Sequence, residues 1–86
     1  MTNTMATLKL FASLSHSLPA AAVDNRLDIP VDAETTVSAV IARFQLPEAL
    51  VHLVLVNGVY IPPEDRPQRR LEPGDVLAIW PPVAGG

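Results

Sequence analysis

The C-terminal end of the sequence is the part whose residue types point most directly to chemistry. Residues 81–86 read PPVAGG, so this segment has no side chain larger than proline or valine. Without a Cβ, Gly85 and Gly86 can enter a narrow channel and adopt φ and ψ values that other residues resist. Pro81 and Pro82 favour an extended, polyproline-like path that rises about 3.1 Å per residue. We therefore expect an extended arm that carries the carboxylate of Gly86 away from a folded body.

The rest of the chain offers few other reactive groups. It contains no cysteine, which excludes disulfides, a thiolate nucleophile and the usual zinc frameworks. His16 and His52 stand alone, without metal-ligand spacing or a nearby serine–acid pair, so we expect ordinary surface or strand residues. We expect no metal site and no cofactor bound by this chain. A carboxylate by itself is a poor electrophile, so another protein would have to activate it.

Composition indicates one globular domain. The chain has 86 residues, of which 49% are hydrophobic and 17% are charged, and its formal net charge is −3. A domain of this size has a single core. The only cluster of basic residues is surrounded by acids, and we expect it to be a solvated loop rather than an anion site. This cluster comprises Arg66, Arg69 and Arg70. Without a concentrated positive footprint, we expect no nucleic-acid partner.

Residues 8–25 imitate a secretory signal peptide only in part. Lys9 precedes an apolar run and three alanines, but it is a single positive charge, and Ser13, Ser15 and His16 interrupt the run. No run approaches the roughly 20 apolar residues of a membrane span. We expect a cytoplasmic protein with no membrane association.

Two alternating segments near the N-terminus predict an antiparallel hairpin. In residues 6–12, the core-facing side chains are Leu8, Leu10 and Ala12. The opposite face of the same segment carries Thr7, Lys9 and Phe11. Residues 26–31 alternate as well, and the connection between the two strands is either a short helical turn ended by Pro19 or a loop. Pro30 cannot donate to a strand ladder, which favours an edge strand or a strand end.

One segment changes to a helical period. Its apolar residues at i, i+3, i+4 and i+7 are Val37, Val40, Ile41 and Phe44. Thr35 or Thr36 supplies an N-cap oxygen, and Pro47 closes the segment. We expect this helix to place the whole stripe, Phe44 included, in the core.

Three further segments complete the expected sheet. Residues 51–58 form a continuous apolar run that suits a central strand, either covered on much of both faces or with one face only partly covered. Asn57-Gly58 favours a tight reversal with positive φ, after which residues 59–61 return beside this strand. Residues 76–80 form the last strand, which we expect to pair in parallel with the first and to lie next to the central strand. Leu77 and Ile79 share one face of it.

Together these segments predict an α+β fold in which one main helix packs across one face of a mixed sheet. This arrangement is the β-grasp, or ubiquitin-like, fold. We expect residues 1–5 to be a flexible leader, residues 6–80 the β-grasp domain, and residues 81–86 the extended tail.

Three of the four aromatic residues are candidates for a docking surface. The alternation places Phe11 and Trp80 on the sheet face opposite the helix, and Tyr60 lies in the short returning strand. Aromatic side chains on an exposed sheet face commonly mark an interface. We therefore expect these three residues to contact a partner; the alternative is that Tyr60 and Trp80 cover the sheet edge as a satellite core.

Several motifs, taken in order, resemble those of the MoaD/ThiS-type sulfur carriers, a ubiquitin-like family. They are LFA in the first strand, TV at the start of the helix, VLVNG, PGD and the terminal PPVAGG. The match runs from about Leu8 to Gly86, and its pattern is closest to the small subunit of molybdopterin synthase. The loop of residues 13–26 and the arginine-rich sequence EDRPQRR depart from the family pattern.

The resemblance implies a carrier protein rather than an enzyme. An adenylyltransferase of the MoeB/ThiF type would use ATP and magnesium to convert the Gly86 carboxylate to an acyl-adenylate. A persulfide enzyme would then supply sulfur, which leaves a thiocarboxylate on Gly86. In the channel of the partner, Gly85 would lie next to the reacting carbon, and Val83 and Ala84 would make small apolar contacts.

The acceptor implied by the resemblance is a larger synthase subunit of the MoaE type in molybdenum cofactor biosynthesis. Thiamine thiazole, cysteine and tRNA thiolation are the other sulfur pathways that this fold serves. A second class of function is a ubiquitin-like modifier joined through Gly86 to lysines of other proteins. A third is a β-grasp binding module whose tail is inert and frays, as many termini do.

Overall fold

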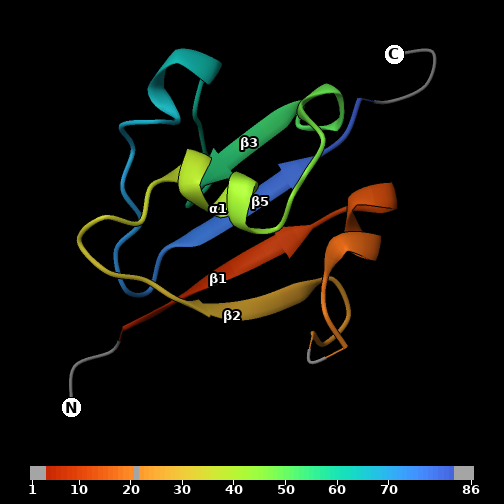
Figure 1. The fold of residues 1–86 in the computed structure, drawn as a ribbon, viewed down its shortest axis with the longest axis horizontal. Helices are drawn as coiled ribbons and strands as arrows, with labels where there is room; N and C mark the ends of the chain where they lie inside the picture. The colour runs from red at the N-terminus through yellow and green to blue at the C-terminus, as the bar shows by residue number, and fades with distance from the viewer. Residues whose placement is uncertain (1–3, 21, 83–86) are drawn as a thin grey trace.

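The structure is a computed structural model that describes residues 4–20 and 22–82. Five strands form one mixed sheet in the order β2-β1-β5-β3-β4 (Figure 1). The strands are β1 (Met5–Leu10), β2 (Arg26–Pro30), β3 (Leu53–Val56), β4 (Val59–Tyr60) and β5 (Val76–Trp80). The helix α1 (Val37–Arg43) crosses one face of the sheet (Figure 1). β1 and β5 are parallel, and the other neighbouring strands are antiparallel. The predicted β-grasp fold is confirmed.

The N-terminal hairpin forms as expected, with a shorter first strand. β1 pairs with β2 from Met5 opposite Pro30 to Lys9 opposite Arg26, and Pro30 ends an edge strand. The connection contains a 3₁₀ helix, η1 (Ala12–Ser17), so the helical alternative holds. The prediction that Ala12 faces the core is wrong. The chain leaves the sheet after Leu10, and Ala12 is exposed, with φ 52°, at the start of η1.

The helix begins at the expected cap and ends early. Thr36 is the N-cap, and its Oγ1 accepts a hydrogen bond from the backbone N–H of Ala39 at 3.1 Å. Gln45 adopts φ 55°, which ends the helix before Pro47 is reached. Phe44 is therefore not inside the core as predicted: it is half-buried, packs against the core, and has the Arg43 guanidinium 5.8 Å from its ring centroid.

The core lies between α1 and the sheet. Its side chains come from the inward-facing positions of the strands and the first turns of α1. Those that are 0% exposed are Leu8, Leu10, Val37, Val54, Leu77 and Ile79. Complete burial of leucine and valine side chains on this face supplies most of the hydrophobic stabilisation available to so small a domain.

The apolar run of residues 51–58 forms an interior strand with the predicted neighbours. β5 occupies the middle of the sheet, and β3 lies between β5 and β4. Because α1 covers only one face, β3 alternates: Val54 and Val56 are buried, whereas Leu53 is 36% exposed and Leu55 is half-buried. The reversal after β3 is confirmed by positive φ at both Asn57 (52°) and Gly58 (83°).

The arginine-rich loop is not wholly solvated. Arg70 is exposed, as predicted, but Arg66 is 8% exposed and its Nε donates to the backbone oxygen of Ile61 at 3.0 Å. The loop folds back because η3 (Pro63–Asp65) turns it toward α1 and Leu71, 2% exposed, anchors its far end in the core. Arg66 therefore belongs to the folded body.

Candidate functional site

The tail leaves the domain from the middle of the sheet. β5 ends at Trp80, whose backbone oxygen accepts a hydrogen bond from the N–H of His52 at 3.1 Å. On the other side, the Phe11 N–H donates to the Ile79 oxygen at 3.1 Å. Pro81 is buried and Pro82 is exposed. The root of the tail is thus held from both neighbouring strands, and Val83, Ala84, Gly85 and Gly86 lie outside the described residues.

An aromatic stack stands at this root. The rings of Phe11 and Trp80 lie with centroids 4.1 Å apart and planes 6° from parallel. Leu10 pairs with Ile79 in the parallel ladder. The residues that follow them, Phe11 and Trp80, therefore lie side by side. Both rings are half-buried, which leaves part of each accessible. Sequence alternation predicted their common face, and the structure adds their direct contact.

The stack continues into a wider apolar surface on the sheet face opposite α1. Leu53 pairs with Trp80 across β3 and β5, and Leu55 pairs with Ala78 on one side and Tyr60 on the other. Cross-strand partners share a face. We name this surface the outer-face patch, and its members are Phe11, Leu53, Leu55, Tyr60 and Trp80. Tyr60 is 49% exposed, and Leu55 separates it from β5, so it lies at the margin of the patch.

Sequence analysis missed the two leucines of this patch. Partial exposure of one face of this run was left open, but no residue of the run was assigned to that face. The signal that could have found Leu53 and Leu55 is the single predicted helix, which can cover only one face of the sheet.

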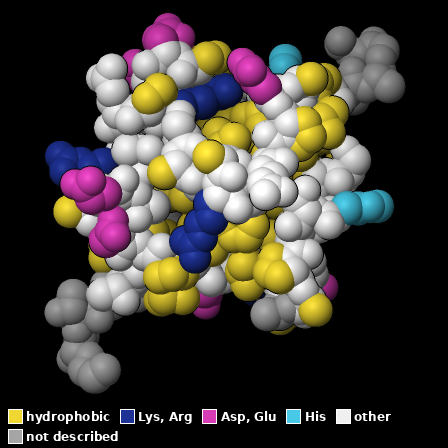
Figure 2. Space-filling model, viewed as in Figure 1, with side chains coloured by type: hydrophobic (Ala, Val, Ile, Leu, Met, Phe, Trp, Pro, Cys, Tyr) yellow, Lys and Arg dark blue, Asp and Glu magenta, His cyan; other side chains and the backbone are white. Residues whose placement is uncertain are grey.

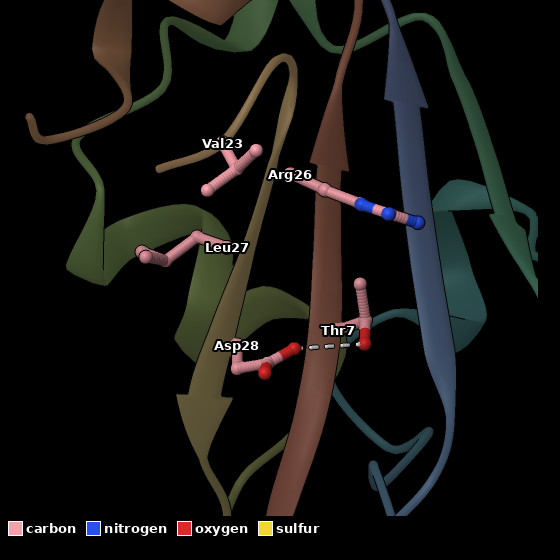
Figure 3. A pocket seen from close by; sticks show the side chains of 5 residues that line it. All are labelled: Thr7, Val23, Arg26, Leu27 and Asp28. Atoms are coloured by element: carbon pink, nitrogen blue, oxygen red, sulfur yellow. Dashed lines mark hydrogen bonds between the residues drawn. The ribbon is translucent and has the colours of Figure 1, made fainter. Parts of the chain in front are cut away.

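A shallow polar pocket borders the patch on the β2 side. Thr7, Val23, Arg26, Leu27 and Asp28 line it, with a cavity volume of about 490 Å³ (Figure 3). Thr7 Oγ1 donates to Asp28 Oδ1 at 3.2 Å. In Figure 3 the Arg26 side chain extends across β1 toward β5. Together with Lys9, its cross-strand partner, it brings positive charge to the edge of the outer-face patch.

Asp75 fixes the other end of β5. Its carboxylate accepts hydrogen bonds from Asn57 Nδ2 and the Glu72 backbone N–H, each at 2.9 Å, and the Arg69 guanidinium lies 3.8 Å away. Burial alone raises the pKa of Asp75, but the hydrogen bonds from Glu72 and Asn57 and the charge of Arg69 outweigh it, so this pKa is lowered. Asn57 Oδ1 also accepts from the N–H of Val76 at 2.9 Å, which ties the β3–β4 turn to the start of β5.

Residues 4–20 and 22–82 contain no group of three or more His, Cys, Asp or Glu side chains that could hold a metal ion. None of the helices within these ranges is long and apolar enough to cross a membrane. What these ranges do present is a strand end held by backbone hydrogen bonds at Ile79 and Trp80, with the outer-face patch beside it.

The sequence was compared with models of known protein families. The model of the ThiS family matches residues 8–86. The chain belongs to the ThiS family. Members are small ubiquitin-like proteins, and the match supports a sulfur-carrier or ubiquitin-like role for this chain. No curated protein sequence matches the chain.

A solved structure supports the same fold. The chain is similar to the crystal structure of SAMP1 from Haloferax volcanii, with 26% sequence identity and a TM-score of 0.63. The alignment covers 95% of this chain and 99% of that chain. The similarity therefore extends over the whole β-grasp domain, whereas the closer likeness to the small subunit of molybdopterin synthase stays a prediction.

Proposed function

We propose that this chain carries sulfur as a thiocarboxylate on Gly86. The observation that carries the proposal is the extent of the ThiS family match, which includes the tail through Gly86 and not only the domain. The glycine pair offers the least steric hindrance to an active site that must close around a backbone carboxylate.

The carboxylate is activated by a partner adenylyltransferase of the MoeB/ThiF type. A carboxylate oxygen of Gly86 attacks the α-phosphorus of ATP, bound with magnesium on that partner, and pyrophosphate leaves. A persulfide sulfur from a donor enzyme then attacks the acyl carbon, and AMP leaves. Cleavage of the resulting acyl disulfide by a second thiol of the donor releases the thiocarboxylate.

The outer-face patch is the surface by which we expect these partners to hold the domain. Trp80 directly precedes Pro81, so a protein that grips the patch receives the tail in a defined direction. The stack of Phe11 on Trp80 orders both rings before a partner arrives, which lowers the entropy lost on docking. Arg26 at the margin favours an acidic rim on the partner.

Molybdopterin synthesis is the pathway that we propose. The terminal PPVAGG and the length of the chain favour it over thiamine, cysteine or tRNA thiolation. In this role a larger subunit of the MoaE type would accept the tail in its active site and take the sulfur from Gly86.

The deciding experiment is the intact mass of the mature protein isolated from its host. A gain of about 16 Da, the difference between sulfur and oxygen, is expected on the C-terminal peptide. Deletion of Gly85 and Gly86 is the matched control and should abolish the gain without changing the thermal unfolding temperature. A mature terminus that extends past Gly86, or an unchanged mass in the presence of ATP, the adenylyltransferase and the sulfur donor, would contradict the proposal.

The same material separates the competing functions. A ubiquitin-like modifier would instead appear in isopeptide conjugates to lysine that require Gly86. Deletion of the chain from its host should abolish molybdopterin while thiamine and thiolated tRNA persist. Loss of either of the latter two products would reassign the pathway. Loss of none of them, with cysteine synthesis unaffected and no isopeptide conjugates, would favour the inert-tail alternative.

A further inference from the structure

Arg66 is a buried cation without an acidic partner. It is 8% exposed, and the hydrogen bond from Nε to the Ile61 oxygen satisfies one of its five N–H groups. Nη2 is shielded from solvent and has no hydrogen-bond partner. Within residues 4–20 and 22–82, the single ion pair joins Arg69 to Asp75, so no carboxylate neutralises Arg66. A buried charge left in this state is costly, and an anion would relieve the cost.

The backbone holds Arg66 in place. The N–H of Ser38 donates to the Arg66 oxygen at 3.1 Å, and the N–H of Val37 donates to the Arg69 oxygen at 2.9 Å. The loop after η3 therefore satisfies the first N–H groups of α1, which would otherwise lack partners. Arg66 cannot leave its position without breaking these bonds.

Arg66 lines a hollow on the helix side of the domain. The hollow has a volume of about 280 Å³ and lies between α1, η2 (Glu48–Leu50) and η3. Its apolar walls are Ile41, Ala42, Leu46, Val51 and Pro63. Figure 2 views the side that carries α1 and shows hydrophobic side chains in recesses of this surface. The size suits one or two aliphatic side chains and is too small for most cofactors.

We propose that this hollow docks a partner protein through a short segment in which Glu or Asp adjoins Leu, Ile or Val. The carboxylate is attracted to the guanidinium of Arg66, which is the cationic residue in the lining of the hollow. The aliphatic neighbour contacts Ile41 and Val51, both half-buried. The outer-face patch lies across the sheet, so one carrier can be held at both surfaces at once.

The charge of Glu48 allows the direction of a change in affinity to be predicted. It is exposed, lines the same hollow, and lies farther than 4.0 Å from the nitrogens of Arg66. An incoming carboxylate is repelled by this like charge. Replacing Glu48 by a neutral side chain of the same shape should therefore strengthen binding.

The probe is the capped peptide Ac-Ala-Leu-Glu-Leu-Ala-NH₂, titrated into the full chain labelled with ¹⁵N. We expect amide shifts in residues 38–51 and 63–66, with an affinity about tenfold higher than for the same peptide with Gln in place of Glu. Sodium acetate at equal concentration should bind more weakly than the peptide, because it lacks the aliphatic contacts. Equal affinity for the Glu and Gln peptides, or for acetate and the peptide, overturns the proposal.

Substitutions in the hollow complete the test. Arg66→Gln should remove the preference for the Glu peptide, but it also removes a donor to Ile61 and can loosen the loop. Ala42→Gln leaves Arg66 untouched and places a larger side chain in the hollow from an exposed helix position. It should weaken binding about fivefold or more, since it displaces the aliphatic contact. Ala39→Gln, exposed on the same helix but not lining the hollow, is the matched control and should change little.

Glu48→Gln should raise the affinity for the Glu peptide and leave that for the Gln peptide unchanged. Unaltered binding by Ala42→Gln, or weaker binding by Glu48→Gln, overturns the assignment. None of these readouts involves Gly86, so failure of the sulfur-carrier proposal and failure of this docking site are distinguishable.

Discussion

Apolar side chains alternate between the two faces of the sheet, but α1 covers the inner face and no described helix covers the outer face. On the inner face α1 covers Leu8, Leu77 and Ile79, which are 0% exposed. On the outer face Leu53 and Trp80 are equally apolar in character, yet they remain partly open. An apolar face that no described helix covers contributes little to a core and commonly marks an interaction site. The difference indicates that the inner face specifies the fold and that the outer face is available to partners.

The largest expected effect tests the inner face. Leu77→Ala should lower the free energy of unfolding by about 3–4 kcal/mol, because it leaves a cavity among fully buried neighbours. Leu53→Ala, on the adjacent strand but the outer face, should cost about 1 kcal/mol. Urea unfolding measures both. Similar losses for the two variants would mean that the faces do not differ as proposed.

If the outer face is the docking surface, loss of its central aromatic residue should slow adenylation by the activating partner. Trp80→Ala should reduce kcat/KM for adenylation by the activating partner about tenfold or more, as removal of a central aromatic anchor does. Its loss of stability should be smaller than that of Leu77→Ala, because Trp80 is only half-buried. Pyrophosphate release reports the rate.

Val59→Ala is the control for that experiment. Val59 is 64% exposed on the neighbouring edge strand and pairs with the inward-facing Val56, so it lies outside the patch. Its adenylation rate should stay within about twofold of the wild type. If Trp80→Ala behaved like Val59→Ala, the outer face would not be the docking surface.

Asp75 precedes β5, the strand that supplies side chains to both faces, and its hydrogen bonds hold the start of that strand. Its folded-state pKa is lowered, so its stabilising contribution is present above the unfolded pKa near 3.8 and is lost as pH falls through the folded value. Asp75→Asn should cost about 1–2 kcal/mol at pH 7 and make stability less dependent on pH below about 4. Thermal unfolding between pH 2.5 and pH 7 measures this. Parallel profiles for the two proteins would exclude the assigned hydrogen bonds and charge.

The smallest effect concerns the stack itself. A double-mutant cycle with Phe11→Ala and Trp80→Ala should give a coupling of about 0.5–1.5 kcal/mol in urea unfolding. A coupling within experimental error would indicate that the rings share a face without supporting each other, and that the patch is less ordered before docking.

Local signals in the sequence predicted much of the fold. Asn57-Gly58 reverses the chain with positive φ, Thr36 caps the helix, and Pro30 ends an edge strand. Each of these depends on the backbone preferences of a few adjacent residues, so no distant contact is needed to predict it. The errors arose where burial decides: Ala12 and Phe44 were assigned to the core, and Arg66 to solvent.

The sequence by itself determined the alternating strands, the amphipathic helix and the side-chain-poor tail, because these follow from spacing and residue type. Only the tertiary structure decided that Phe11 stacks on Trp80 and that Arg66 is buried beside α1. Such facts depend on strand register and on which face the single helix covers. Both are set by contacts between residues far apart in the chain, and no local pattern encodes them.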